Sequence, residues 1–353
     1  MSSSSNIIYL SHSQIDKVKW NSCIDTANNG RIYGNSFYLD AMSKNWDALV
    51  LNEYEAVMPL TWNKKMGIAY LYQPFLTAQL GVFGKRVSEK TVANFIESIP
   101  SSFRYIEMAL NKGNLSGIPT GFSIHRSNYV LDLNFSYEYL YQNYKENIQR
   151  NIKKAFQQGC TVQKNIDVEK IIELAVLQMK SHGHESKENI ERFRTLYTDL
   201  HKRKMTATYG IVSVDNKLLA SCVFFFSHNR AYYILVGNHP DGKSSGASHA
   251  LIDAFIKDNA GKNMVLDFEG SDIPTLAYFY SSFGAEHEIY PAVKINRLPF
   301  YFFQYSLSNQ QINRSCNFNI DLFACYQRNL DTVSFCYCCF IRKLIFIINL
   351  KCW

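Results

Sequence analysis

The 353-residue sequence has no long uncharged apolar run, so we expect no helical membrane span. The longest candidate, 335–350, is interrupted by Arg342 and Lys343. The N-terminus has no basic region followed by an apolar stretch, which predicts a cytoplasmic protein without a signal peptide. Charged residues are also few, 19% against the usual value of about 25%. The net charge of +7 is too small to predict nucleic-acid binding without a local cluster of cations.

Cysteine is sparse in the first three hundred residues, where only Cys23, Cys160 and Cys222 occur. Scattered thiols of this kind favour a reducing compartment, in which cysteine serves as a small core residue. The remaining cysteines lie in the last forty residues and do not form two C-x-x-C pairs, so we expect no zinc site there. The segment His182-Gly183-His184-Glu185 has no further ligand at a suitable spacing, and no metal is predicted for it.

The pattern of apolar residues predicts an α+β protein with two lobes. Residues 1–135 begin with helices and continue as a meander of short strands, which indicates a first lobe. Residues 136–205 predict a helical connector that starts with one long helix, and residues 206–304 predict a second lobe. The tail, 305–353, has no clear amphipathic period and no glycine or proline, so we expect it to lie outside the fold.

The order of elements in the second lobe predicts a ligand-binding position. Three antiparallel strands are followed by a loop, a helix, a strand at 264–268, a second helix and a last strand. The loop Lys243–Ser248 therefore lies at the carboxyl end of a strand, where open sheets bind ligands. Its glycine, its lysine and the free amides of the next helix would favour an anion. A flexible linker in which Ser245 caps that helix is the alternative.

Two segments of this lobe resemble motifs of the GNAT acyltransferases. Lys243–Ser248 resembles the pyrophosphate loop Q/R-x-x-G-x-G/A, with lysine at its first position and serine at its last. Residues 277–285, Ala-Tyr-Phe-Tyr-Ser-Ser-Phe-Gly-Ala, resemble the segment A-x-x-F-Y-x-x-x-G-F. With Asn147–Ala155 and Leu266–Ser271, they resemble the FemAB-like branch, in which two GNAT-like halves form one chain. The resemblance covers 31–302 and implies two GNAT-like lobes, each a mixed, mostly antiparallel sheet flanked by helices.

The resemblance also implies a donor site. The residues that would hold the phosphates of an acyl-CoA donor are Lys243, Ser245, Gly246, Ala247 and Ser248. Tyr280 stands where many GNAT enzymes have a tyrosine near the leaving thiolate, so it would act as a general acid; a core aromatic residue is the alternative. Peptidoglycan-bridge enzymes of the FemAB group are expected to have a lysine at about this place. Its absence here favours an acyl thioester over an aminoacyl-tRNA.

Asp267 and Glu269 are the candidate proton acceptors. They alternate with apolar residues, so their carboxylates would share one face of a strand near its carboxyl end. A carboxylate with a raised pKa could take a proton from an attacking amine, and Glu269 is favoured because it lies nearer the strand's end. Capping of the next helix is the alternative. For the acyl oxygen, a main-chain amide of Val236 or Gly237 is the candidate donor, since Gly237 can let its strand splay.

Four polar residues form a stripe on the predicted helix 136–158 and are candidates for substrate binding. They are Asn147, Arg150, Asn151 and Lys154. Their spacing places them on one helix face, where they could hold a phosphorylated acceptor or the nucleotide end of the donor. A solvated basic face is the alternative.

The sequence therefore predicts an N-acyltransferase that moves an acyl group, such as acetyl, from a thioester to an amine. The expected donor is acyl-CoA, and catalysis would rest on positioning and oxyanion stabilisation without a covalent enzyme intermediate. One alternative takes the donor from aminoacyl-tRNA and acts on a cell-wall precursor. A second alternative is a ligand-binding relative without catalysis. The expected partner is a small amine or a cell-envelope precursor; tRNA is disfavoured and no DNA is expected.

Overall fold

The computed structural model describes residues 6–119, 121–180, 186–270 and 272–298. The predicted tail and the segment from His182 to Glu185 lie outside the described residues. None of the described helices is long and apolar enough to cross a bilayer.

The first lobe forms one end of a continuous 13-stranded sheet, in the order β1-β2-β3-β4-β6, with β5 paired to β3. Its strands are β1 (Ile7–Leu10), β2 (Asn45–Leu51), β3 (Ala56–Lys65), β4 (Ile68–Leu71), β5 (Phe83–Gly84) and β6 (Phe103–Ala109). Its helices are α1 (Lys17–Thr26), α2 (Ser36–Met42), α3 (Glu89–Glu97) and the 3₁₀ turns η1 (His12–Gln14), η2 (Ile32–Gly34) and η3 (Lys112–Asn114). Each α-helix buries a large side chain against this sheet, Trp20, Tyr38 and Phe95 in turn.

The connector contains α4 (Tyr137–Gln142), α5 (Glu146–Gln157), β8 (Thr161–Lys164), α6 (Val168–Lys180) and α7 (Lys187–Lys202). The single long helix predicted for 136–158 is wrong, because the chain turns between α4 and α5. Lys145 has an extended conformation, with ψ 150°, and its amide donates to the carbonyl oxygen of Ser282 at 2.9 Å. A tertiary hydrogen bond therefore takes the place of a helical one at this point.

The second lobe continues the sheet in the order β13-β7-β12-β11-β10-β9-β8. Its strands are β7 (Ser123–Asp132), β9 (Thr206–Val212), β10 (Leu218–Ser227), β11 (Arg230–Asn238), β12 (Val265–Asp267) and β13 (Glu286–Asn296), and its helices are α8 (Pro240–Ser245), α9 (Ala247–Asn259) and α10 (Pro274–Ser281). In this part of the sheet only the pair β11–β12 is parallel.

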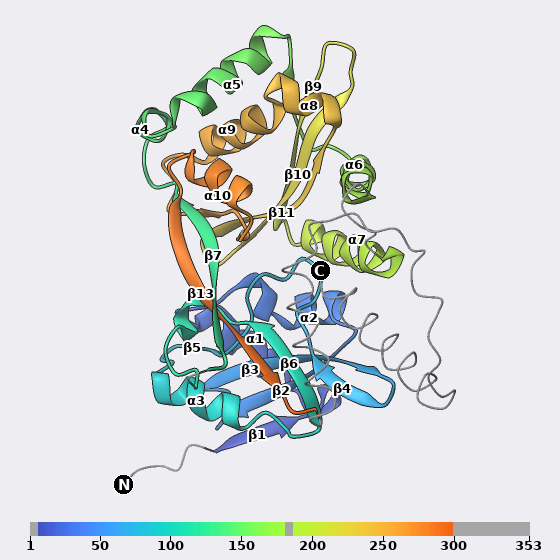
Figure 1. The fold of residues 1–353 in the computed structure, drawn as a ribbon, viewed down its shortest axis with the longest axis vertical. Coiled ribbons are helices and arrows are strands. Elements are labelled where there is room, and N and C mark those ends of the chain that lie inside the picture. Colours follow the sequence, from blue (N-terminus) through green and yellow to red (C-terminus); the bar gives the residue numbers. More distant parts are fainter. Residues whose placement is uncertain (1–5, 120, 181–185, 271, 299–353) are drawn as a thin grey trace, which may run out of the picture.

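Strands β7 and β13 join the two lobes, and Figure 1 shows them running from one lobe to the other. β13 pairs with β7 through residues 286–293 and with β6 through residues 292–296. The predicted fold class is confirmed: a mixed, mostly antiparallel sheet is flanked by helices in both lobes. The lobe boundaries at 135 and 205 remain a prediction.

The sheet of the second lobe is covered on both faces. Phe225 and Tyr232 belong to a core shared with the first lobe, α6 and α7. Phe224 and Tyr233, the next residues along each strand, belong to a second core with α5 and α9. Burial on both faces explains why β10 reads as a nearly continuous apolar run rather than as an alternating one.

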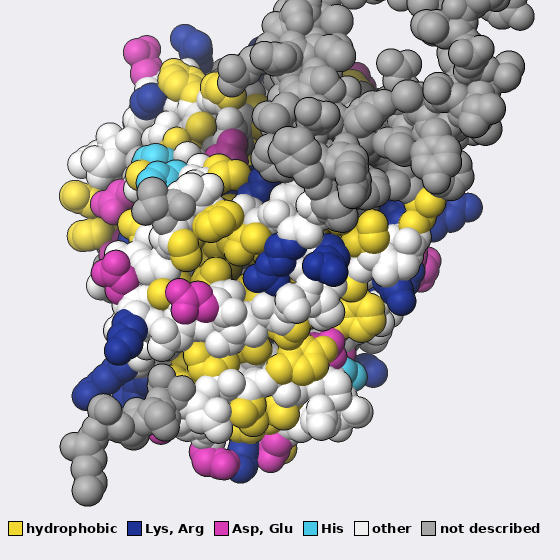
Figure 2. Space-filling model, turned by 60° about the horizontal axis from the view of Figure 1, so that its bottom comes forward, with side chains coloured by type: hydrophobic (Ala, Val, Ile, Leu, Met, Phe, Trp, Pro, Cys, Tyr) yellow, Lys and Arg dark blue, Asp and Glu magenta, His cyan; other side chains and the backbone are white. Residues whose placement is uncertain are grey.

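Figure 2 shows a face of the molecule on which hydrophobic side chains are interspersed with polar ones. Lysine and arginine side chains occur there singly or in small groups among acidic ones. This face therefore offers no broad basic surface of the kind that nucleic acids select.

Candidate functional site

The sheet of the second lobe opens where β11 and β12 part. Their pairing ends at Tyr232 and Asp267, but β11 continues to Asn238. In the described part of the chain, no strand pairs with β11 on that side beyond Tyr232. The register with β10 also shifts at Ile234, and such a bulge bends a strand and increases its twist. The result is a row of main-chain groups at the carboxyl end of β11 that no strand of the described chain pairs on this side.

One main-chain amide in this row points into the opening. The amide of His239 donates to Leu219 on β10, so by the alternation of an antiparallel pair the amide of Gly237 also faces β10. The amides of Val236 and Asn238 then face the open side, and that of Asn238 donates to Oε1 of Gln178 on α6 at 2.7 Å. Of the two amides predicted to polarise an acyl oxygen, only that of half-buried Val236 has the required direction.

Gly237 has a packing role. A Cβ atom at this position would lie 2.7 Å from the main-chain nitrogen of Ala175, so the glycine allows α6 to approach β11 closely. The opening of the sheet is therefore bounded by α6 on one side of Gly237.

Asp267 is the fixed point of the site. It is buried, and its carboxylate accepts hydrogen bonds from Arg230 Nη1 at 2.6 Å, Asn128 Nδ2 at 3.0 Å and the amide of Glu269 at 2.9 Å. Arg230 is itself nearly buried, and removing one partner of such an ion pair costs about 3–5 kcal/mol. Because three donors occupy its oxygens, we assign Asp267 to positioning rather than to the predicted proton transfer.

Glu269 has the properties of a general base. The strand ends at Asp267 and Glu269 has φ +66°, so a turn, rather than the predicted strand alternation, sets its position. Its Oε1 is buried and has no hydrogen-bond partner among the described residues. Burial and the charge of Asp267 raise the pKa of Glu269 well above its usual range, although Tyr33, Arg230 and Arg31 oppose the shift. A carboxyl group held in this way is poised to exchange a proton with a bound ligand.

Tyrosines from both lobes surround Glu269. Burial raises the pKa of Tyr33, Tyr38 and Tyr280, and the charge of Glu269 contributes to each shift. Tyr33 and Tyr38 belong to the core shared with the first lobe, whereas Tyr280 belongs to the core under α9. Glu269 therefore lies at the boundary between the two cores. The hydroxyl oxygen of Tyr33 is buried there and has no hydrogen-bond partner in the described chain.

Tyr280 is both a core aromatic residue and a neighbour of the carboxyl group. Its ring stacks on Phe268 with 4.7 Å between centroids and meets Tyr233 edge-on at 6.5 Å. Burial and the charge of Glu269 raise the pKa of Tyr280 to about 12, so its hydroxyl group keeps its proton at neutral pH. A protonated hydroxyl in this position suits a general acid.

The predicted phosphate-binding loop is not a loop. Residues 240–245 form α8, with Pro240 at its first position, where its fixed φ suits a helix. Lys243 is exposed, but Ser245, Gly246 and Ala247 are buried. Ser245 donates to the carbonyl oxygen of Gly242 at 3.1 Å and does not cap the next helix, whose N-cap is Gly246.

Gly246 is packed under α5. It has φ +80°, and a Cβ atom there would lie 2.3 Å from the carbonyl oxygen of Asn151. The hydroxyl of Ser248 donates to Oδ1 of Asn238 at 2.6 Å, which ties the start of α9 to the end of β11. The glycine thus provides close helix packing against Asn151, and phosphate binding at this turn remains a prediction.

The predicted polar stripe on α5 divides into two pairs. Asn151 lies against the start of α9, with Nδ2 donating to the carbonyl oxygen of Asn147 at 2.8 Å and lying 3.5 Å from Nε2 of His249. Arg150 and Lys154 are exposed. Asn151 therefore packs against the start of α9, whereas Arg150 and Lys154 are exposed and have no ion pair among the described residues; substrate binding by the four residues remains a prediction.

His249 is a residue that the sequence reading missed. Its ring lies edge-on to Phe279 at 5.0 Å between centroids, and its Nδ1 is buried without a hydrogen-bond partner among the described residues. Burial lowers the pKa of His249 to about 4, so the imidazole is neutral at physiological pH. The signal in the sequence that could have identified His249 is its position in the first turn of the helix that follows Gly246.

Two further motifs occur in the same segment. Gly237–Ser244 fits the P-loop pattern G-x-x-x-x-G-K-[ST], and Gly242–Gly246 fits the nucleophile-elbow pattern G-x-S-x-G. Neither structure forms, because α8 begins at Pro240 and takes both motifs into a helix. Ser244 donates to the carbonyl oxygen of Asp241 at 3.0 Å instead of being presented on a strand-to-helix turn. Among the described residues no group of three or more metal-ligating side chains occurs.

Comparison with known proteins supports the resemblance read from the motifs. Residues 142–274 match the family model described as acetyltransferase (GNAT) domain, a segment that runs from the end of α4 to the start of α10. Comparison with curated proteins gives no match. The fold is similar to the crystal structure of FemX, with a TM-score of 0.58 and 12% identity over 81% of this chain and 96% of that one. It is also similar to a conserved protein of unknown function from Bacteroides thetaiotaomicron VPI-5482, with a TM-score of 0.51 and 13% identity over 79% and 97% of the two chains.

The packing of Gly246 under α5 predicts the stability of a matched pair of variants. Gly246→Ala and Gly261→Ala both place a side chain at a positive φ, +80° and +77°, but no atom lies within 4 Å of the Cβ position at Gly261. We expect Gly246→Ala to lose about 1–3 kcal/mol more free energy of unfolding than Gly261→Ala, because its methyl group meets the α5 backbone. Urea denaturation measures the difference, and equal losses would show that α5 does not press on this turn.

The buried carboxyl group of Glu269 predicts a pH-dependent stability. Its pKa is raised in the folded state, so the folded chain holds a proton that the unfolded chain releases as the pH rises above about 4.5. Wild-type stability should therefore fall above that pH, and Glu269→Gln should remove the loss. We expect the variant to gain about 1 kcal/mol or more over wild type between pH 4.5 and pH 8.

Thermal or urea unfolding at the two pH values tests this expectation. Glu97→Gln is the control, because Glu97 is exposed on α3 and its replacement should give a difference that does not change with pH. The quantity to compare is the difference in stability between Glu269→Gln and wild type at each pH. If this difference is no larger at pH 8 than at pH 4.5, Glu269 is not protonated in the folded chain.

Proposed function

We propose that this chain, whose residues 142–274 match the GNAT acetyltransferase domain, transfers an acyl group from a thioester to an amine. The observation that carries the proposal is the carboxyl group of Glu269, whose buried Oε1 has no hydrogen-bond partner among the described residues, beside the point where β11 and β12 part. Acyl transfer to an amine needs a proton acceptor, an amide for the carbonyl oxygen and an acid for the leaving group. The candidates for these three roles are Glu269, the main-chain amide of Val236 and Tyr280, in that order.

The reaction would proceed in one step of bond exchange at the acyl carbon. Glu269, in its ionised form, takes one proton from the neutral amine nitrogen as it attacks. The amine nitrogen forms a bond to the carbonyl carbon while the amide of Val236 stabilises the negative charge on the carbonyl oxygen. The carbon–sulfur bond then breaks, and the Tyr280 hydroxyl protonates the thiolate. The proton taken up by Glu269 returns to Tyr280 through solvent, which restores both groups. Asp267 and Arg230 keep Glu269 in place throughout.

The donor we propose is acyl-CoA, which the GNAT family match supports. Because Gly246 is packed against Asn151, the phosphates would lie outside the buried turn. The exposed cations Lys243, Arg150 and Lys154 lie on the two helices that meet at this turn, and they are the candidates to bind those phosphates. Ser248 and Ala247 remain candidates only through the main-chain groups of the first turn of α9.

A second candidate function is transfer from aminoacyl-tRNA to a cell-envelope precursor. The FemAB-like resemblance of the sequence and the FemX-like fold favour it. It predicts binding that weakens steeply with salt, since tRNA contacts many cations at once. A ligand-binding protein without catalysis is the third reading.

The catalytic role of Glu269 can be tested by thiol release from acetyl-CoA in the presence of a panel of primary amines. We expect Glu269→Gln to lower kcat by about 10²–10⁴-fold, the usual contribution of a general base. Tyr280→Phe should lower kcat less and remove the alkaline limb of its pH profile. The exposed Glu97→Gln is again the control and should keep full activity. An active Glu269→Gln enzyme would rule out Glu269 as the base.

The donor can be identified by calorimetry with coenzyme A and with charged tRNA as separate ligands. We expect heat from coenzyme A, with a loss of about two- to fivefold in affinity for each of Lys243→Ala and Lys154→Ala, as for exposed ion pairs. Lys90→Ala, on α3 of the first lobe, is the matched control and should have no effect. Heat from charged tRNA alone would favour the second candidate, and heat from neither would favour the third.

A further inference from the structure

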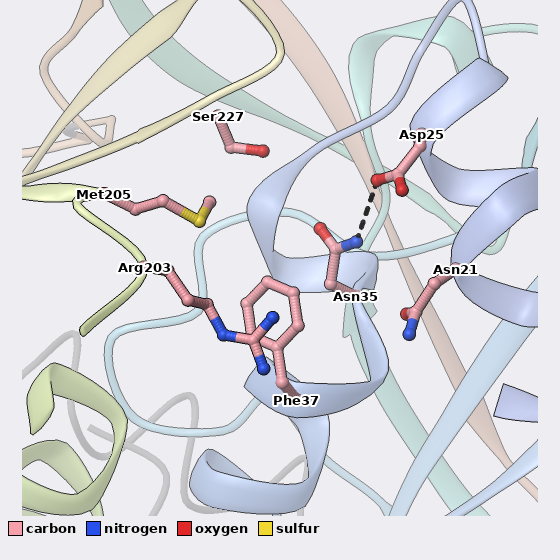
Figure 3. A pocket seen from close by; sticks show the side chains of 7 residues that line it. All are labelled: Asn21, Asp25, Asn35, Phe37, Arg203, Met205 and Ser227. Carbon is pink, nitrogen blue, oxygen red and sulfur yellow. Dashed lines mark hydrogen bonds between the residues drawn. The ribbon is translucent and has the colours of Figure 1, made fainter. Parts of the chain in front are cut away.

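A second cavity lies at the lobe junction, away from Glu269. It has a volume of about 250 Å³ and is lined by α1, α2, the end of α7 and the end of β10, as Figure 3 shows. The lining residues are Asn21, Asp25, Asn35, Phe37, Arg203, Met205 and Ser227. Ser227 precedes β11, whereas Val236 lies near its other end, roughly 20 Å further along the strand. None of the residues proposed for acyl transfer lines this cavity.

Asn35 lines this cavity, and its side-chain oxygen is buried behind the cavity wall. The residue is 3% exposed, and its Nδ2 donates to Oδ1 of Asp25 at 3.2 Å. This bond fixes the orientation of the amide, because a flipped amide would set two oxygens against each other. Oδ1 of Asn35 therefore faces away from Asp25, as Figure 3 shows, and has no hydrogen-bond partner among the described residues. A buried acceptor left in this state requires a donor from a ligand or a water molecule.

Ser227 adds a second acceptor. Nε2 of the half-buried His228 lies 3.1 Å from the carbonyl oxygen of Ile24, so it must carry a proton. Burial lowers the pKa of His228, which keeps the ring neutral and leaves Nδ1 as an acceptor. The Ser227 hydroxyl, 2.5 Å from Nδ1, then donates to it and can only accept from the cavity.

On the opposite side of the cavity, the guanidinium group of Arg203 provides hydrogen-bond donors. The guanidinium of Arg203 lies over the ring of Phe37, 4.6 Å from its centroid, and its Nε donates to Asp199 at 2.9 Å. Its two Nη groups bond to no described residue. Phe37 and Met205 give the space between the two poles an apolar wall.

From this arrangement we propose that the cavity binds a small zwitterion, an amino acid or a short peptide. The ammonium group would donate to Ser227 Oγ and the Asp25 carboxylate, and the ligand's carboxylate would accept from the Nη groups of Arg203. An apolar side chain would lie against Phe37 and Met205. The volume is below the roughly 300–1,000 Å³ of drug-sized sites, which suits a ligand of this size. The proposal rests on these residues and is independent of the proposed function.

Calorimetry on the full-length protein tests the proposal with five probes: glycine, L-leucine, L-alanyl-L-alanine, N-acetyl-L-leucine and L-leucinamide. We expect one-site binding of at least one zwitterion, and binding at least tenfold weaker for the two leucine derivatives that lack one charge than for L-leucine. Preference for the dipeptide over the amino acids would identify a peptide as the ligand, and the reverse would identify a free amino acid. Equal binding of the charge-deleted derivatives, or no binding of any zwitterion, would overturn the proposal.

Variants locate the site. Arg203→Gln and Ser227→Ala should each weaken binding of the best zwitterion by about tenfold, the effect of losing one charged hydrogen bond. Lys202→Gln removes the same charge from the same turn of α7 but does not line the cavity, so it should bind as wild type does. Unchanged affinity in both Arg203→Gln and Ser227→Ala would show that the zwitterion binds elsewhere and would overturn the assignment.

Discussion

The ion pair between Asp267 and Arg230 determines where the sheet of the second lobe opens. Arg230 begins β11 and Asp267 ends β12, so the ion pair runs diagonally across the short stretch over which these two parallel strands are joined. The same carboxylate also accepts from Asn128 on β7 and from the amide of Glu269. One buried acid therefore connects three strands and the turn that presents the candidate base. The part of β11 that is no longer paired with β12, and the turn that contains Glu269, both begin beside Asp267.

The position of Glu269 has an energetic cost that the rest of the fold must offset. A carboxyl group placed next to Asp267, with one oxygen unpartnered, cannot ionise easily, and this makes it a poor stabiliser but a responsive proton acceptor. The residue also has φ +66°, a conformation in which few residues other than glycine are found without strain. Strain and an unsatisfied buried group at one residue are typical of functional positions, because neither improves the stability of the chain.

Much of the second lobe could be predicted from its sequence, because its strands are separated by turn residues and its helices have apolar faces. The predictions that failed concerned features that depend on contacts between residues distant in the sequence. The break between α4 and α5 follows from the carbonyl of Ser282, which local periodicity does not reveal. The helix α8 had a local signal, Pro240 at its first position, but the glycines and serines that follow indicated a loop. The sequence could not distinguish Gly246 and Gly237 from glycines in flexible loops. Each is required because a neighbouring backbone, that of Asn151 or Ala175, lies too close for a side chain.

The candidate site shows the same division between local and distant signals. The sequence predicted two acids at the end of a strand and favoured Glu269 as the base because of its position, but it did not show which contacts would make the two acids different. Asp267 is the anchor because Arg230 and Asn128 reach it, and Glu269 is isolated because tyrosines of the first lobe, above all Tyr33, cover it. Hydrogen bonds within the second lobe and contacts with the first lobe together make two similar carboxylates chemically different.

The short segment around η2 links both polar sites at the lobe junction. Tyr33 influences the pKa of Glu269, and Asn35, two residues later, lines the second cavity. The three residues of η2 are buried, and the amide of Ile32 donates to the hydroxyl of Tyr232 on β11 at 3.2 Å. Because interiors are close-packed, a segment held in this way cannot move at one end and remain fixed at the other. The lobe contact that isolates Glu269 is thus the same contact that shapes the floor of the second cavity.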